Sequence, residues 1–225
     1  MSKHLERDLD NLQHDLLALA ASVEEAVHRA IRSLQDRDAA MAQQVIDGDT
    51  QIDEEENHIE EEALKMLALH QPVAVDLRRI TAALKINNEL ERMADLAEDI
   101  AERALYLSTL APVPIPETLQ QMTELTAFMV RQSLQVFIDL DSRGARRLCR
   151  MDDEVDRYNV EIIHELIQLM QSGPEMVEPG MSLFSATRHL ERIADHATNI
   201  AEDVIYLVEG EIVRHRPAAV RGDDS

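Results

Sequence analysis

The sequence predicts an all-α fold, made of two tandem repeats of a three-helix bundle with long antiparallel helices and coiled-coil-like packing. Three observations support this prediction: the composition, the spacing of the apolar residues and an internal repeat. Aromatic residues are only 3% of the 225 residues, while 45% are apolar, and there are 6 glycines and 7 prolines. This composition favours helices with narrow apolar stripes over sheets.

The charge and the cysteine content restrict the function and the compartment. Acidic residues outnumber basic ones by 44 to 22, which leaves a formal net charge of -22. Such a field repels a phosphate backbone, so it argues against nucleic-acid binding and favours basic protein surfaces or cations as partners. Cys149 is the only cysteine, so no intrachain disulfide can form.

The hydropathy pattern predicts no insertion into a membrane. No apolar stretch approaches the ~18 residues of a membrane span, and the first fifteen residues lack the apolar core of a signal peptide. We therefore expect a cytoplasmic protein that reaches the inner membrane only through protein partners.

The apolar positions of residues 1–110 predict a first repeat of three helices. From Leu5 to Ala30 the apolar residues are spaced alternately by four and three, and Leu34 closes the series. This is a heptad seam, typical of a long helix that lies nearly parallel to its neighbours. A second helix is predicted over 39–69, where His70-Gln71-Pro72 ends it, and a third over 84–107.

Alternating prolines in residues 111–116 predict an extended linker, because proline cannot continue a helix. The pattern restarts after this linker and predicts a second repeat over residues 117–210. Its helices are expected at 119–140, 144–170 and 181–208, with a loop over 172–180. Residues 211–225 are expected to be a polar tail.

The two halves repeat one another in sequence. Asp49-Thr-Gln-Ile-Asp53 matches Asp152-Asp-Glu-Val-Asp156 at an offset of 103 residues (152 minus 49). Leu90-Glu-Arg-Met-Ala-Asp95 matches Leu190-Glu-Arg-Ile-Ala-Asp195 at an offset of 100 (190 minus 90). Two copies of one unit follow, with a three-residue length difference between the second and third helices of each half.

Each half therefore carries two acidic pairs whose members are four residues apart. This spacing puts both carboxylates on one helix face, where they repel each other by about 0.2–0.5 kcal/mol. At about 100° per residue these acids lie beside the apolar stripe, at the same angles in both halves. Ridges of acids on neighbouring helices can converge into an oxygen-only cation site. The candidate metal ligands from these pairs are Asp49, Asp53, Glu91, Asp95, Asp152, Asp156, Glu191 and Asp195.

An alternative without metal remains open for these acids. Arg92 and Arg192 follow Glu91 and Glu191 directly and precede Asp95 and Asp195 by three residues. Ion pairs at this helical spacing would also offset the repulsion.

Two longer segments carry a resemblance to a known family. The segments from Leu90 to Glu102 and from Leu190 to Glu202 resemble the paired signature of the PhoU family, and His70-Gln-Pro-Val-Ala-Val-Asp-Leu-Arg78 is similar to the segment that joins its second and third helices. The similarity covers nearly the whole chain. The resemblance adds Asp99 as a ninth candidate metal ligand. Asn199 stands in its place in the second half, a difference that bears on whether both halves load metal equally.

The resemblance implies both a fold and a function. It implies paired three-helix bundles, often dimeric, with E/DxxxD motifs that hold metal ions, among which iron, manganese, magnesium and zinc all remain open. It also implies a cytoplasmic negative regulator of phosphate uptake and of the phosphate-starvation (Pho) response. Such a regulator couples a Pst-type phosphate ABC transporter ATPase to a PhoR-type sensor histidine kinase. We expect no catalysis.

The segment before the third helix is a candidate docking site for these partners. Asp76, Arg78 and Arg79 belong to it, and similar family residues make them candidate partner-binding residues. The alternative is that Asp76 is a plain N-cap beside solvated arginines.

Two other functions are open on the residues alone. A ferritin-like di-iron carboxylate oxidase would use Glu-x-x-His pairs, which occur at Glu55–His58 and Glu161–His164. Their helical angles point them to solvent rather than into a bundle core. A metal-free coiled-coil adaptor would explain the heptad seam but not the matched acids.

Three further residues are interpreted structurally. His189 and His196 flank Asp195 and are interpreted as surface or packing residues. Cys149 occupies the place of Ile46 in the repeat and is interpreted as a small apolar filler.

Overall fold

Helices account for almost all of residues 3–213, the part of the chain that the computed structural model describes. No strand occurs among these residues, so the all-α prediction is confirmed. The elements are α1 (Lys3–Asp36), α2 (Ala39–His70), α3 (Ala74–Thr109), α4 (Glu117–Asp139), α5 (Ser142–Cys149), α6 (Asp152–Gln171), the 3₁₀ turn η1 (Pro174–Met176) and α7 (Val177–Glu209). No helix in residues 3–213 is long and apolar enough to cross a membrane.

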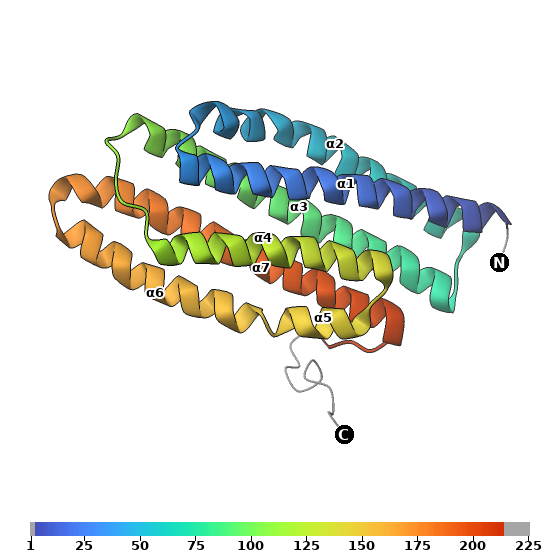
Figure 1. Cartoon of the computed structure of the whole chain (residues 1–225). Coiled ribbons are helices and arrows are strands. Elements are labelled where there is room, and N and C mark those ends of the chain that lie inside the picture. The colour runs from blue at the N-terminus through green and yellow to red at the C-terminus, as the bar shows by residue number, and fades with distance from the viewer. Residues whose placement is uncertain (1–2, 214–225) are drawn as a thin grey trace, which may run out of the picture.

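The helices form two three-helix bundles that lie side by side (Figure 1). In the first bundle α1, α2 and α3 pack against one another. In the second, α4 and α7 pack with a third helix that is split into α5 and α6. The last helices of the two bundles, α3 and α7, pack together and join the halves. The two tandem three-helix repeats are thereby confirmed.

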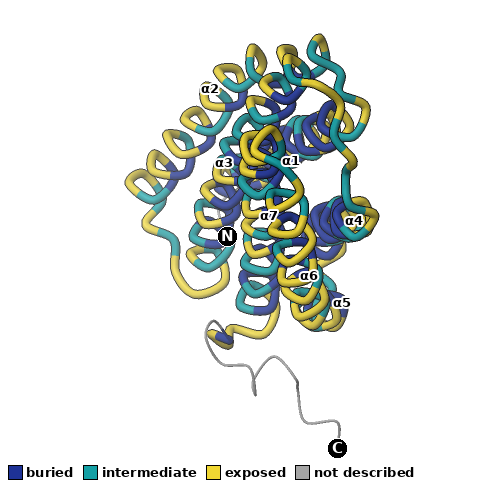
Figure 2. The backbone as a smooth tube through the Cα atoms, turned by 90° about the vertical axis from the view of Figure 1, so that its left-hand side faces the viewer, coloured by how far each residue is buried: buried dark blue, intermediate teal, exposed yellow. Residues whose placement is uncertain are grey.

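The heptad seam of α1 lies in the core of the first bundle. Leu16, Leu19, Val23 and Ala30 are fully buried, and Ala26 packs against the core from its edge. In Figure 2 the buried residues of all the long helices face inward and the exposed ones face outward. The 3.6-residue period that predicts the helices therefore also predicts which face of each helix is buried.

The third helix begins ten residues earlier than predicted, at Ala74 instead of 84. Gln71, with φ 44°, ends α2 in the left-handed region, and Ala74, with φ 49°, begins α3 in the same region. The apolar residues of the first turn, Val75 and Leu77, are exposed, so no buried stripe marks this stretch before Ile80. Its periodic signal is therefore weak, although it is helical.

The fifth helix and the loop after it also differ from the prediction. The helix predicted over 144–170 is broken at Arg150 and Met151, where backbone bonds to Arg147 and Leu148 close a tight turn between α5 and α6. The loop predicted over 172–180 contains η1 and the first turn of α7. Pro179 fits into that turn because the first N–H groups of a helix have no partner within it.

The linker is fixed to the preceding helices. Residues 111–116 are outside any helix, and the Arg37 side chain donates to the Leu110 carbonyl at 2.7 Å and also to the Leu107 carbonyl. These bonds satisfy carbonyl groups at the end of α3 that a helix leaves unpaired. In the segment predicted as a polar tail, Val213 is buried, and residues 214–225 lie outside the described residues.

Polar pairs line the contact between α3 and α7. Lys85 donates to Asp203 at 2.8 Å, and Asn199 donates to Glu89 at 3.0 Å. The Nδ1 atom of His196 lies 2.6 Å from a Glu89 oxygen. Charged and amide groups this close in a half-buried contact strongly favour one register of the two helices.

The repeat offset of 100 residues relates two of these pairs to each other. Glu89 corresponds to His189, and Asn199 corresponds to Asp99. The equivalent of the Glu89–Asn199 pair is therefore His189 with Asp99, whose Nδ1 and Oδ2 atoms lie 3.5 Å apart. An acid at position 199 would face the Glu89 carboxylate, which explains physically why the second half departs from Asp99.

Asn199→Asp is expected to destabilise the fold by about 1–3 kcal/mol, because a carboxylate would replace a hydrogen-bond donor beside Glu89. Adding Glu89→Gln restores a donor and should recover most of the loss, although His196 then loses its charged partner. Urea unfolding of the native chain, the single variant and the double variant measures this. Equal stability of Asn199→Asp and the native chain would contradict the role of this pair.

Candidate metal centre

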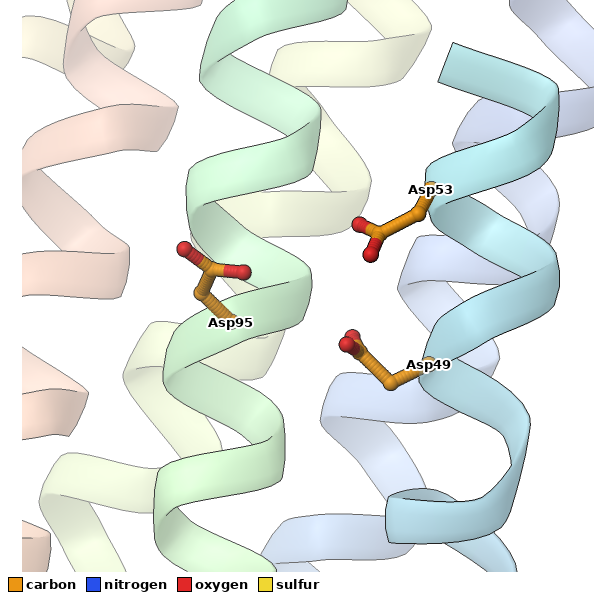
Figure 3. A group of neighbouring side chains, drawn as sticks. All are labelled: Asp49, Asp53 and Asp95. Atoms are coloured by element: carbon orange, nitrogen blue, oxygen red, sulfur yellow. The ribbon is translucent and has the colours of Figure 1, made fainter. Parts of the chain in front are cut away.

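Three carboxylates converge between α2 and α3. Asp49 and Asp53 come from α2 and Asp95 from α3, and each offers an oxygen such that all three lie within 4.8 Å of one another. Figure 3 shows the three side chains pointing toward one another across the gap between the two helices. Asp49 and Asp95 are half-buried and Asp53 is exposed.

The apolar pattern of the two helices places these acids. Ile52 is buried between Asp49 and Asp53, and Ala94 and Leu96 are buried on either side of Asp95. Because neighbours in a helix are about 100° apart, the acids lie at the shoulder of each core-facing stripe. Packing α2 against α3 through these stripes brings the two shoulders together.

More polar groups extend the cluster by about one turn along α2 and two turns along α3. Asn87 is buried and donates from Nδ2 to the side chain of Glu56 at 2.8 Å and to its carbonyl at 3.1 Å. Among the described residues, Asn87 Oδ1 and Glu91 Oε2 are buried oxygens without a hydrogen bond. Glu91 Oε2 lies 3.3 Å from Nε of Arg92 and so has an ion-pair partner, whereas Asn87 Oδ1 has no partner within residues 3–213. A buried oxygen without a donor, such as Asn87 Oδ1, suits a cation.

Sequence reasoning missed Glu56, Asn87 and Glu98. Glu98 belongs to the same acidic surface, because the charges of Asp49, Glu102 and Asp95 all act on it. A search for acids at a spacing of seven residues would have found Glu56 seven residues after Asp49. The repeat hides these residues, since the second half has Asn159, Thr187 and Thr198 in their places.

Loss of water contact and mutual repulsion both act on the first cluster. Desolvation raises the pKa of Asp49, and the charges of Asp53 and Asp95 raise it further. Desolvation also raises the pKa of Asp95, with Arg92 acting in the opposite direction. The pKa of Glu91 is raised by desolvation and by Asp95. The cluster therefore holds its negative charge at a cost that a bound cation would offset.

The second half has an equivalent but looser cluster. Burial raises the pKa of Asp152 to about 7, and the charges of Asp195 and Asp156 contribute to the shift. Desolvation and Asp156 raise the pKa of Asp195. Asn159 donates to Glu191 at 3.5 Å. Unlike Asp49, Asp53 and Asp95, these acids do not meet within 4.8 Å among the described residues.

Arginines neutralise part of the negative charge of these acids. This agrees in part with the alternative drawn from the sequence, in which arginine ion pairs and not a metal offset the repulsion. Arg92 lies 3.3 Å from Glu91 and 3.7 Å from Asp95, and Arg188 pairs with Glu191 at 2.9 Å. Arg192 forms no ion pair within 4.0 Å among the described residues, although its charge lowers the pKa of Asp95 and Asp195. Arginine pairing is therefore partial. Asp49 and Asp53 form no ion pair with an arginine within residues 3–213.

The donor set fits a hard or borderline divalent ion. Every oxygen of the first cluster comes from a carboxylate or an amide, and no thiolate is near, which suits magnesium, manganese or iron better than structural zinc. Of the nine predicted ligands, the structure brings Asp49, Asp53 and Asp95 together, with Glu91 one turn away. Asp99 instead faces His189, and Asp152, Asp156, Glu191 and Asp195 form the looser second cluster.

The other candidate residues are placed as follows. His58, Glu161 and His164 are exposed, so the Glu-x-x-His pairs do not form a bundle-core iron site. His196 and His189 lie in the α3–α7 contact described above. Cys149 packs at the edge of the core, and burial raises the pKa of its thiol to about 12.

Asp76, Arg78 and Arg79 lie in the first two turns of α3. The N-cap position is Val73, and its side chain makes no cap bond, so Asp76 is not the N-cap that the alternative assumed. Asp76 lies three residues further on, in the first turn, where a negative charge favours the helix dipole.

Comparison with known proteins now decides the family. A family model described as the PhoU domain matches residues 16–104 and again residues 119–204. The chain belongs to the PhoU family. The double match corresponds to the two halves of the repeat.

Individual relatives agree with this assignment. The phosphate-specific transport system accessory protein PhoU homolog of Aquifex aeolicus is 38% identical over 96% of this chain and 98% of its own length. The crystal structure of PhoU from Pseudomonas aeruginosa has a TM-score of 0.89 at 36% identity, covering 92% of this chain and 99% of that one. The phosphate transport system regulatory protein PhoU of Streptococcus pneumoniae has a TM-score of 0.86 at 30% identity, covering 93% and 99%.

The metal-free protein is expected to lose stability as pH rises from about 4 to 7, through Asp152. Its pKa is raised from 3.8 to about 7. A group with a raised folded-state pKa favours folding below its unfolded pKa, and this contribution is lost as pH rises through the folded pKa. Urea unfolding between pH 5 and 8 should give a shallower decline for Asp152→Asn than for the native chain. Asp139→Asn, a surface change, should follow the native chain, and equal slopes for all three would contradict the prediction.

Proposed function

We propose that this protein is a cytoplasmic accessory and regulatory protein of phosphate transport, which represses phosphate uptake and the Pho response when phosphate is plentiful. Its partners are a Pst-type transporter ATPase and a PhoR-type sensor histidine kinase, and it acts as a homodimer without catalysing a reaction. Membership of the PhoU family is the observation on which this proposal rests. Its relatives carry the names accessory protein of phosphate-specific transport and phosphate transport regulatory protein.

We further propose that cations bind to the acidic clusters. Their binding stabilises the arrangement of the helices in which the protein binds its partners. Asp49, Asp53 and Asp95, with Glu91 beside them, form the principal site, and the Asp152–Asp195 cluster is the weaker one. A bound divalent ion would neutralise the carboxylates and cross-link α2 to α3 and α6 to α7. The convergence of three carboxylates from two helices supports this part of the proposal.

Deleting the gene should raise the expression of phosphate-starvation genes in cells grown at high phosphate, as measured with a reporter for one such promoter. Expression that stays repressed in the deletion strain would overturn the regulatory role. A plasmid copy of the native gene is the control and should restore repression.

Replacing Asp49 and Asp53 together by Asn should weaken the binding of Mn²⁺ by about tenfold or more, because two of three converging ligands lose their charge. Calorimetric titration of the metal-free protein measures this. Asp47→Asn, an exposed change two residues before Asp49 on α2, is the matched control and should bind as the native chain does. If the native chain binds no Mn²⁺, Mg²⁺ or Fe²⁺, the protein is a metal-free adaptor.

A further inference from the structure

An apolar groove opens at the end of the molecule where α2 turns into α3. Its volume is about 450 Å³, and its lining includes Leu12 from α1, Val75 and Arg79 from α3, Phe137 and Leu140 from α4, and Val208 from α7. We call it the end groove. In Figure 1 the start of α3 and the ends of α4 and α7 lie at the same end of the molecule, which both bundles share.

Large apolar side chains remain exposed at the end groove. Val75 is 56% exposed, Leu140 50% and Val208 42%. Fully burying a side chain of this size is worth about 1.5–3 kcal/mol. A partner that covers the groove would gain part of this free energy at each residue. The acidic clusters have no comparable set of exposed apolar side chains to bury.

The backbone near the end groove contains several residues in the strained left-handed conformation. Gln71, Ala74 and Leu140 have φ of 44°, 49° and 51°, and with Arg37 they are the non-glycine residues at positive φ among those described. A left-handed residue other than glycine costs about 1–2 kcal/mol. Glycine would cap α4 more readily, yet Leu140 occupies that position and places a large apolar side chain at the groove.

Arg79 adds an unpaired charge to this apolar lining. Its side chain lines the groove and makes no ion pair or hydrogen bond with any described residue, although acidic residues outnumber basic ones by 44 to 22. An arginine beside apolar surface pairs well with a carboxylate, because both partners are desolvated together. The groove therefore complements a ligand with an apolar body and one acidic group.

We propose that the end groove docks an amphipathic helical segment of a partner protein, which inserts apolar side chains between α3, α4 and α7 and presents a carboxylate to Arg79. This inference rests on the proposed function, since it locates the surface where that function meets a partner. Val75 precedes Asp95 by twenty residues along α3, about 30 Å at 1.5 Å per residue. Docking and cation binding therefore take place at separate surfaces.

A second copy of this chain fits the groove less well than a different protein. A symmetric contact would bring two copies of Arg79, with like charges, to the same apolar surface. A partner segment with its own acidic residue satisfies Arg79 while the remaining acidic surface keeps other anionic proteins away.

Binding of the purified transporter ATPase, and of the purified cytoplasmic part of the sensor kinase, tests the proposal. Val75→Asp and Arg79→Glu should each weaken binding of at least one of them by about tenfold or more. The matched controls are Val160→Asp on α6, since Val160 is also 56% exposed, and Arg131→Glu on α4, which is exposed. Both controls should bind as the native chain does. Circular dichroism verifies that every variant is folded.

Four other results would contradict the proposed docking of a partner at the end groove. If the native chain binds a partner and both groove variants bind equally well, the groove assignment fails and the proposed function stands. If the native chain binds neither protein, the partner role and the groove assignment fail together. If Val75→Asp changes the mass of the native particle in light scattering, the occupant is a second copy and not a partner. If the control variants weaken binding as much as the groove variants, binding follows total charge and the groove has no special part.

Discussion

The contact between α3 and α7 determines the relative position of everything else in the molecule. Each of these helices packs against all the helices of its own bundle and carries acids on its outer shoulder. A slip by one helical turn would move one acidic cluster about 5.4 Å along the other bundle. It would also separate Lys85 from Asp203 and Glu89 from Asn199, and leave half-buried charges without partners. The polar pairs therefore specify the register more than they add to stability.

The acidic clusters use the same helices that build the core. Ile52 and Leu90 are buried within one or two residues of the candidate ligands, so a bundle cannot fold without bringing these carboxylates near one another. Folding thus raises the free energy of the ionised acids, as the raised pKa values of Asp49, Asp95 and Asp152 show. A domain is stable by only about 5–15 kcal/mol, so any cation that binds the folded form alone shifts this balance appreciably.

Much of the fold follows from the sequence because the apolar period is strong. The long helices α1, α2 and α4 agree with prediction to within a few residues, since an unbroken buried stripe marks them. The start of α3 could not be predicted, because Val75 and Leu77 are exposed and give no stripe. The break at Arg150 and Met151 could not be predicted either, because no proline or glycine stands there and the turn is closed by backbone bonds.

The candidate site was predictable in outline only. The repeat singles out Asp49, Asp53 and Asp95 because the same spacings recur at Asp152, Asp156 and Asp195. That the first set converges within 4.8 Å depends on how α2 packs on α3, which spacing alone does not define. Asn87 and Glu56 lack equivalents in the other half and so escape a search based on repetition. The end groove is formed by four helices distant in sequence and leaves no local signal.

Equivalent positions of the two halves hold different residues: Glu89 corresponds to His189, and Asp99 to Asn199. This difference shows what joining two copies in one polypeptide makes possible. A dimer of identical single bundles has the same side chain at both equivalent places, so an acid facing an acid on one side would face an acid on the other as well. Once duplicated and fused, each copy can change alone: here Glu89 meets Asn199 while Asp99 meets His189. Fusion thus frees the two halves from identity, and one half has a tight cluster of carboxylates while the other has a looser one.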